Sequence, residues 1–130
     1  MILLDTHIWF WWVQGDSRLS VRHQQILNGA LSNQTIGVSA FSCWEISMMI
    51  SRGRVVVAVP PLDWISSALA PSGIILLPLT PEICAESVQL PQPIHGDPAD
   101  RIIIAKARVH SALLLTEDLK ILVYPHVSTQ

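Results

Sequence analysis

Cysteine and charge are both scarce in this sequence of 130 residues, which contains two cysteines and only 14% charged residues. Cys43 and Cys84 are too few, and too deep in apolar stretches, for a disulfide framework or a zinc site, which favours a reducing compartment. No apolar run reaches the roughly 18–20 residues that span a bilayer, and Met1–Asp5 lacks the basic region of a signal peptide. We therefore expect a cytoplasmic protein with no membrane contact.

A strongly basic surface is also missing. The formal net charge is −2, which excludes a protein that binds nucleic acid through a bulk positive field. Any such contact must be local, and surface solubility explains scattered basic residues equally well. The local clusters are Arg18 with Arg22, Arg52 with Arg54, and Arg101 with Lys106 and Arg108. Because linkers, repeats and low-complexity segments are lacking too, we expect residues 1–130 to form a single domain.

Short, wholly apolar segments alternate with helical patterns along the chain. Strands of this kind are typical of a parallel sheet that is covered on both faces. We predict strands at 2–4, 35–38, 74–77 and 112–116, an edge strand at 123–127 that Pro125 weakens, and helices at 8–13, 20–29, 42–50, 60–69, 81–90 and 98–110. This order predicts an α/β protein, a three-layer α/β/α sandwich with a central, mostly parallel sheet and right-handed crossovers.

The segment His95–Ala107 contains the first candidate site residue. Asp97 followed by Pro98 is typical of a helix cap and a first helical residue. Asp100 then falls at the third helical position, near the positive end of the helix dipole and in front of an apolar run that holds the first turn against the core. In the alternative interpretation, both aspartates only start the helix. Three further acidic residues bear on this choice.

Acidic residues follow the ends of three predicted strands or begin the helices behind them. Asp5 ends the first strand, Glu45 lies in the first turn after the second, and Asp118 follows the fourth. Ligands of parallel sheets bind beyond the carboxyl ends of the strands, so these residues and Asp100 are expected on one rim. Each has a structural alternative: Asp5 as a turn former, Glu45 in a capping box with Ser42, and Asp118 as a helix cap.

Four carboxylates on one rim, with only Arg101 as a nearby cationic partner, must raise one another's pKa or bind a cation. Oxygen ligands without a His or Cys cluster favour Mg²⁺ or Mn²⁺ over zinc. Such sites typically serve phosphoryl transfer by activating water. Glu82 and Glu86 also lie near a strand end, but their spacing on an apolar helix indicates a solvated face.

Several short motifs follow one another in a defined order and spacing over nearly the whole chain. They are Leu3-Leu4-Asp5-Thr6-His7 with Trp9 and Trp12, Val38-Ser39-Ala40, Ser42 with Trp44-Glu45-Ile46, Gly53-Arg54, His95-Gly96-Asp97-Pro98 with Asp100-Arg101, and Leu115-Thr116 with Asp118. Together these motifs resemble a PIN-domain protein of the VapC toxin type. The chain departs from the family pattern at Ala99, where a large apolar residue is frequent, and at Pro125.

The resemblance implies a Mg²⁺- or Mn²⁺-dependent ribonuclease that is the toxin of a toxin–antitoxin pair. Its acidic catalytic and metal-binding site matches Asp5, Glu45, Asp100 and Asp118. Asp97 matches the Asp-Pro-x-Asp-Arg pattern, and Thr6 and Thr116 match small hydroxyl positions, so these three are expected to support the ligands. The implied partners are an RNA substrate, a small antitoxin that blocks the acidic site, and a second copy of the chain.

Other functions fit the residues less well. A haloacid dehalogenase-type phosphohydrolase needs a second aspartate where the chain has His7, and a receiver-like phosphoacceptor needs a lysine that Leu115–Asp118 does not supply. A catalytically degenerate PIN scaffold that only binds partners should have lost an acid, whereas all four are present. We interpret His7 and His95 as hydrogen-bonding structural residues rather than catalytic ones.

A homodimer has independent support, because a mean hydropathy of +0.42 is high for a monomer of this size. Most of the five tryptophans are expected in the core, although stacking on bases is the alternative. Trp11 and Trp12 point in different directions, so one of them can face a partner. Their helix and the helix at 60–69 are the expected walls of an antitoxin groove.

Overall fold

The computed structural model describes all 130 residues. The strands are β1 (Ile2–Leu4), β2 (Ile36–Ser39), β3 (Ile74–Leu77) and β4 (Leu113–Leu115). The helices are α1 (Thr6–Gln14), α2 (Val21–Ala30), α3 (Ala40–Ser51), α4 (Pro61–Leu69), α5 (Pro81–Val88), α6 (Pro98–Val109) and α7 (Leu119–Leu122). Every predicted helix and the first four predicted strands are therefore present, with boundaries shifted by a few residues. No helix is long and apolar enough to cross a membrane.

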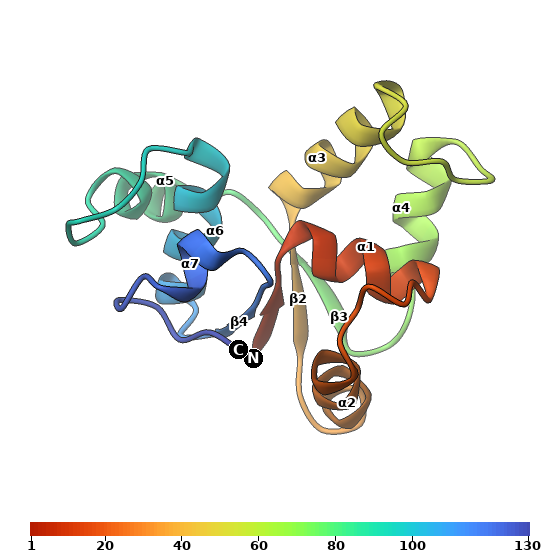
Figure 1. Cartoon of the computed structure of the whole chain (residues 1–130), viewed down its shortest axis with the longest axis horizontal. Helices are drawn as coiled ribbons and strands as arrows, with labels where there is room; N and C mark the ends of the chain where they lie inside the picture. Colours follow the sequence, from red (N-terminus) through yellow and green to blue (C-terminus); the bar gives the residue numbers. More distant parts are fainter.

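The four strands form one parallel sheet in the order β3-β2-β1-β4. The chain runs outward from β1 through β2 to β3 and then returns to the other side of β1, so the strand order reverses between β1 and β4 (Figure 1). Open parallel sheets bind ligands at this kind of reversal. The topology therefore selects the carboxyl ends of β1 and β4 as the place for a site.

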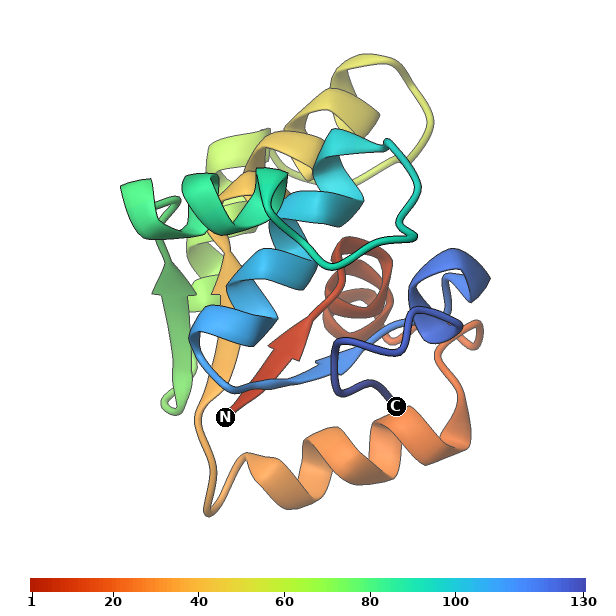
Figure 2. The same ribbon diagram turned by 90° about the vertical axis from the view of Figure 1, so that its left-hand side faces the viewer.

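Helices cover both faces of the sheet, which confirms the predicted three-layer α/β/α arrangement. Figure 1 shows α5, α6 and α7 on one side of the sheet and α1, α2, α3 and α4 on the other. Figure 2, turned to face this side, shows α6 running in front of the strands and α5 packed across the upper part of α6. The amino terminus lies at the amino end of β1, whereas Gln130 at the carboxyl terminus exchanges backbone hydrogen bonds with Leu114 and Thr116 toward the carboxyl end of β4 (Figure 2).

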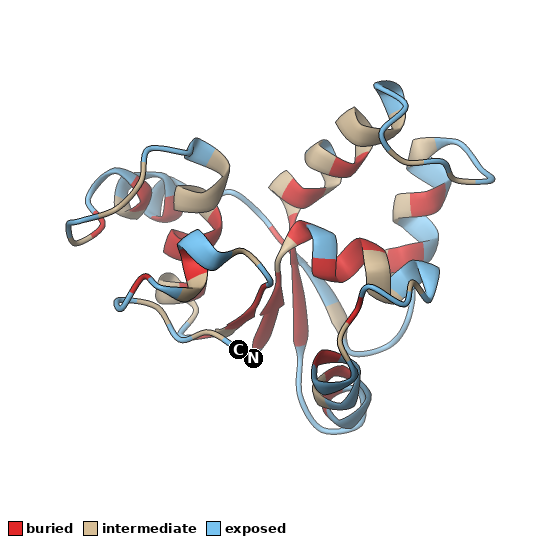
Figure 3. Ribbon diagram, viewed as in Figure 1, coloured by how far each residue is buried: buried red, intermediate tan, exposed pale blue.

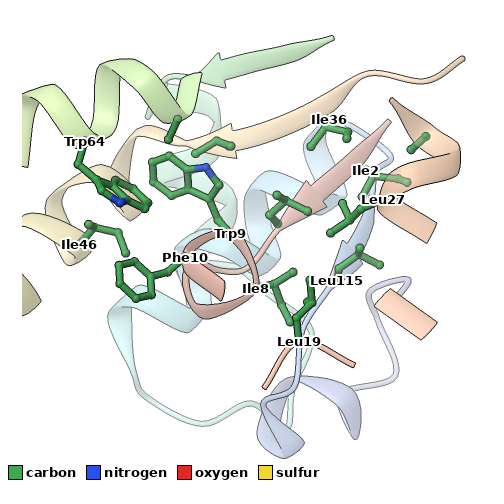
Figure 4. Close-up of a cluster of buried hydrophobic side chains, with 14 residues drawn as sticks. Ile2, Ile8, Trp9, Phe10, Leu19, Leu27, Ile36, Ile46, Trp64 and Leu115 are labelled. Atoms are coloured by element: carbon green, nitrogen blue, oxygen red, sulfur yellow. The ribbon is translucent and has the colours of Figure 1, made fainter. Parts of the chain in front are cut away.

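Alternation along the strands divides the buried residues between two cores. Successive strand side chains point to opposite faces, so Ile2 and Leu4 join one core while Leu3 joins the other. The strands are the most buried elements in Figure 3, apart from the edge strand β3. The larger core contains Trp9 and Trp64, which contact each other edge-to-face at 5.2 Å (Figure 4).

The expected fifth strand at 123–127 is wrong. Asp118 caps the short helix α7 instead, and Tyr124 turns into the core, where its hydroxyl donates a hydrogen bond to the Pro91 carbonyl at 2.7 Å. Only residues 128–130 run beside β4, where Leu114 forms an isolated parallel bridge with Thr129. Pro125 lacks the N–H that a strand needs, so pairing begins only after it.

Lys106 in α6 is fully buried, which overturns its expected place in a basic surface cluster. Its Nζ donates hydrogen bonds to Ser39 Oγ at 2.7 Å and to the Leu77 carbonyl at 2.9 Å. These bonds tie α6 to the carboxyl ends of β2 and β3. No carboxylate pairs with the ammonium group, and burial lowers the pKa of Lys106 from 10.5 to about 8.

This burial predicts that the protein gains stability with rising pH. Between pH 8 and 10.5 the folded state binds fewer protons at Lys106 than the unfolded state does, so the free energy of unfolding rises. The gain from pH 7 to pH 10 should be on the order of 2 kcal/mol. Lys106→Met should lack it when both proteins are unfolded with urea at each pH. Parallel pH profiles of the two proteins would contradict the prediction.

Candidate acidic active site

The predicted site residues meet where the strand order reverses. Asp5 directly follows β1, Thr116 directly follows β4, and Asp118 comes two residues after Thr116. Because β1 and β4 are parallel neighbours in register from Ile2 with Leu113 to Leu4 with Leu115, both segments emerge at the same edge of the sheet. The helices α1 and α3 also begin at this edge (Figure 1).

One open pocket of about 400 Å³ collects all four predicted acids. Its lining residues are Asp5, Thr6, His7, Trp11, Glu45, Asp100, Glu117 and Asp118. Asp97 and Thr116 do not line it, although both were expected near the ligands. Glu117 is a fifth carboxylate that the sequence interpretation did not single out, because a residue between Thr116 and Asp118 has no periodic signal of its own.

Asp5 has both carboxylate oxygens bound by neighbours. Oδ1 accepts a hydrogen bond from the Thr6 N–H at 2.8 Å as the N-cap of α1, and Oδ2 accepts one from the buried Thr116 hydroxyl at 2.7 Å. The same Thr116 oxygen accepts the Asp118 N–H at 3.0 Å. Thr116 therefore links the residues that follow β1 and β4. Its support of the site runs through hydrogen bonds rather than through the pocket wall.

Glu45 reaches the pocket through a chain of buried hydroxyl groups. The Thr6 hydroxyl donates to Glu45 Oε1 at 2.6 Å, so the Ser42 hydroxyl, 2.8 Å from Thr6 Oγ1, is the donor in that contact. The capping-box alternative for Ser42 and Glu45 is wrong, since Ser39 caps α3 by accepting from the Phe41 N–H. Helix α3 therefore begins at Ala40, and Glu45 is available for the site.

The two aspartates that begin α6 have different surroundings. Asp97 is exposed and caps the helix by accepting from the N–H groups of Ala99 and Asp100. Asp100 is half-buried, lines the pocket, and accepts a hydrogen bond from His95 Nε2 at 2.6 Å. The interpretation of His95 as a hydrogen-bonding residue is confirmed. Arg101 does not pair with a carboxylate, because its Nε donates to the His95 carbonyl.

Asp118 combines both roles considered for it. Its Oδ1 caps α7 by accepting from the Lys120 N–H at 2.9 Å, and its side chain also lines the acidic pocket. Capping uses one oxygen, so the second remains available for a ligand.

Burial and mutual repulsion act together on these carboxylates. Burial is the main cause that raises the pKa of Asp5, Glu45 and Asp100, and neighbouring acids raise each of them further. Asp118 acts on Asp5 and Asp100 in this way. No lysine or arginine forms an ion pair with any of the four predicted ligands. The pocket is therefore a concentration of negative charge that no lysine or arginine neutralises.

The donor set fits a hard divalent cation that keeps part of its water shell. No three His, Cys, Asp or Glu side chains are close enough together to form a ready-made metal cage. Mg²⁺ is usually bound by one or two carboxylates together with several waters, and a pocket of about 400 Å³ leaves room for them. Asp5, Asp100 and Asp118, with Glu45 beside them, are the residues that can hold such an ion.

Comparison with known proteins agrees with this architecture. The PIN domain family model matches residues 2–126. The chain belongs to the PIN-domain family. This PIN domain is 32% identical to Ribonuclease VapC22 of Mycobacterium tuberculosis over 125 residues, which cover 96% of this chain and 92% of that protein. The resemblance to VapC-type proteins inferred from the motifs is confirmed.

Solved structures share the fold of this PIN domain. A chain of VapBC2 from Rickettsia felis, crystallised with a DNA fragment from its promoter, superposes with a TM-score of 0.73 at 18% identity, covering 100% of this chain and 98% of that one. A chain of FitAcB from Neisseria gonorrhoeae gives a TM-score of 0.68 at 20% identity, covering 99% and 96%. At these identities the likeness concerns the fold.

Proposed function

We propose that this PIN-domain protein is a Mg²⁺- or Mn²⁺-dependent endoribonuclease and the toxin of a toxin–antitoxin pair. The observation that carries the proposal is the meeting of Asp5, Glu45, Asp100 and Asp118 in one pocket at the strand-order reversal, without a lysine or arginine partner. The 32% sequence identity to VapC22, which is named a ribonuclease, supports RNA as the substrate.

The residues of the pocket divide the work of hydrolysis. Asp5, Asp100, Asp118 and Glu45 would hold the cation, which supplies water activation and charge stabilisation at the phosphate when bound. Thr6, Thr116 and His95 hold three of these carboxylates through hydrogen bonds of 2.6–2.7 Å. The Ser42 and Thr6 hydroxyls are engaged with each other and with Glu45, not with a histidine base. Water is therefore the nucleophile that we assign.

Cleavage of RNA by the purified chain tests the proposal. We expect cleavage of a long single-stranded RNA with Mg²⁺ or Mn²⁺ and none in excess EDTA, with activity restored when either ion is added back. Full activity in EDTA would contradict metal dependence. If no RNA is cleaved with either ion, the degenerate protein-binding scaffold becomes the better interpretation.

We also propose two protein partners, an antitoxin and a second copy of the chain, and a cytoplasmic location. A chain of a toxin–antitoxin complex from Klebsiella pneumoniae shares this fold, which supports an antitoxin partner. The negative charge of the acidic pocket would attract a basic side chain of that partner. Large apolar side chains on the surface, among them Leu62, Val88 and Leu119, support a homodimer of single-domain chains. Light scattering of the isolated protein measures this, and a monodisperse monomer would contradict it. We place the protein in the cytoplasm, with its RNA substrate.

A further inference from the structure

A second hollow opens beside the acidic pocket and has the opposite electrostatic character. This groove of about 360 Å³ runs between α1 and α3 and shares Thr6, His7, Trp11 and Glu45 with the acidic pocket. Its remaining wall contains three arginines, Arg18, Arg52 and Arg54. Helix α4 does not line this groove, because it turns Trp64 and Ala68 into the core.

The arginines at the end of α3 are held on a defined turn but have no ionic partner. Gly53, with a φ of +69°, ends the helix in the left-handed conformation that favours glycine. The Gly53 N–H bonds to the Ile50 carbonyl and the Arg54 N–H bonds to the Met49 carbonyl, which fixes the direction of the chain. Neither Arg52 nor Arg54 forms an ion pair or a side-chain hydrogen bond, and both are exposed. Their charges are available to a ligand.

The third arginine, Arg18, is held in place by Asp16 and Trp11. Arg18 forms an ion pair with Asp16 at 2.7 Å, and its guanidinium carbon lies 5.5 Å from the centre of the Trp11 ring. This stacking orients Arg18 on the helix α1 side of the groove, across from Arg52 and Arg54.

An aromatic pair stands on α3 next to the catalytic carboxylate. Trp44 is 56% exposed although it is among the largest apolar side chains of the protein, and its ring stacks on Phe41 at 5.4 Å and 27°. Trp44 lines the groove, whereas Phe41 lines a small hollow on the other side of Glu45. Core packing, which was expected for most tryptophans, does not describe Trp44. A flat, exposed, supported ring is suited to stacking on a base.

We propose that the α1–α3 groove binds a single-stranded segment of the RNA substrate adjacent to the phosphate that is cut. Arg52 and Arg54 bind its phosphates, and Trp44 stacks on one unpaired base. This inference rests on the proposed ribonuclease function and names the part of the substrate that the acidic pocket cannot attract. A pocket of five carboxylates repels phosphates, so binding energy has to come from a neighbouring basic surface.

The residues that line the α1–α3 groove suit an RNA ligand better than a protein segment. A partner helix would use the apolar side chains Met48, Met49 and Val55, but it would leave two unpaired arginines and an exposed tryptophan without a function. Phosphates and bases use both. Stacking requires an unstacked base, which selects single strands over duplexes.

Binding of a fluorescein-labelled, 12-nucleotide single-stranded RNA of mixed sequence, followed by anisotropy, tests the inference. An Asp100→Asn background keeps the strand intact. Arg52→Gln with Arg54→Gln should lower the slope of log affinity against log salt by about 1.4, since each phosphate contact on a single strand contributes about 0.7. Arg22→Gln, which removes an exposed arginine of α2 outside the groove, is the matched control and should leave the slope unchanged.

Trp44 has a different expected signature. Trp44→Ala should weaken single-strand binding by about 5- to 150-fold with no change of salt slope. It should have little effect on the same sequence as a duplex, and Trp44→Phe should restore most of the affinity. Equal losses for single strand and duplex would mean that Trp44 only supports the fold, and would overturn the stacking assignment.

Cleavage by the protein with Asp100 intact separates this inference from the function on which it rests. The double arginine variant should have a raised KM and an unchanged kcat, because its contacts are equal in the ground and transition states. If the unaltered protein cleaves RNA but the groove variants bind and cleave as it does, the groove inference is wrong and the ribonuclease proposal stands. If no form binds or cleaves RNA, both fail.

Discussion

Asp5→Asn is expected to abolish RNA cleavage without loss of stability. Asp5 is the carboxylate at the strand-order reversal, and its neighbours Thr6 and Thr116 hold both of its oxygens in place. The change removes one negative charge that the cation needs and keeps the volume of the side chain. We expect a loss of at least ~100-fold, which exceeds the usual cost of changing a residue one shell further from a metal.

The fold should tolerate this variant well. Asparagine caps a helix about as well as aspartate, and its amide can donate to the second lone pair of the Thr116 hydroxyl. Burial raises the pKa of Asp5 above 3.8 in the folded protein. At neutral pH the ionised Asp5 therefore opposes folding. This cost shrinks as the pH falls below the raised pKa of the folded state, and it is gone below 3.8, where Asp5 is protonated in both states.

Asp5→Asn should consequently be at least as stable as the unaltered protein at pH 7, with the difference shrinking in acid. Urea unfolding at pH 7 and pH 4 measures the stability, and release of a fluorophore from a labelled RNA measures the activity. Asp63→Asn makes the same chemical change at an exposed residue of α4 and should leave activity unchanged. An Asp5→Asn protein with near-normal cleavage would remove Asp5 from the ligand set.

Much of this architecture could be predicted because its local signals agree with its tertiary structure. The apolar runs at 2–4 and 74–77 become strands, and the Asp97-Pro98 pair begins α6 as expected. The parallel sheet then brings Asp5, Glu45, Asp100 and Asp118 to one rim, since every strand ends at the same edge. The expectation that ligands bind beyond the carboxyl ends of the strands depends only on the order of strands and helices, and this order can be read from the sequence.

Features that depend on how distant segments pack, or on a choice between two similar local signals, could not be predicted from the sequence. Ser39 and Ser42 are both plausible caps for α3, and the earlier one forms the cap because β2 extends to Ser39. Lys106 looks like a surface residue by type, but the face of α6 that carries it is buried against β2 and β3. The α1–α3 groove joins Arg18 to Arg52 and Arg54, which lie more than thirty positions away and form no motif with it.

The two aspartates at the start of α6 allow a metal-binding role to be distinguished from a helix-capping role. They are three positions apart on one helix turn, yet Asp100 lines the acidic pocket and Asp97 is exposed and only contacts N–H groups of the helix. The same substitution at both positions removes the same charge from the same region. A general electrostatic effect would change both variants alike, and a coordination effect would not.

We expect Asp100→Asn to lose Mn²⁺ binding and at least ~100-fold in cleavage rate, more than the usual cost of changing a residue outside the ligand set. Asp97→Asn should keep both within about threefold, because Asp97 is exposed and does not line the acidic pocket. Asparagine replaces the cap, so Asp97→Asn should change the free energy of unfolding by well below ~1 kcal/mol, whereas Asp97→Ala should cost about 1 kcal/mol and still bind Mn²⁺. Electron paramagnetic resonance of free Mn²⁺ measures binding without reference to activity. A loss of Mn²⁺ binding by Asp97→Asn as severe as that of Asp100→Asn would make Asp97 a metal ligand, because a capping role alone gives no reason for that loss.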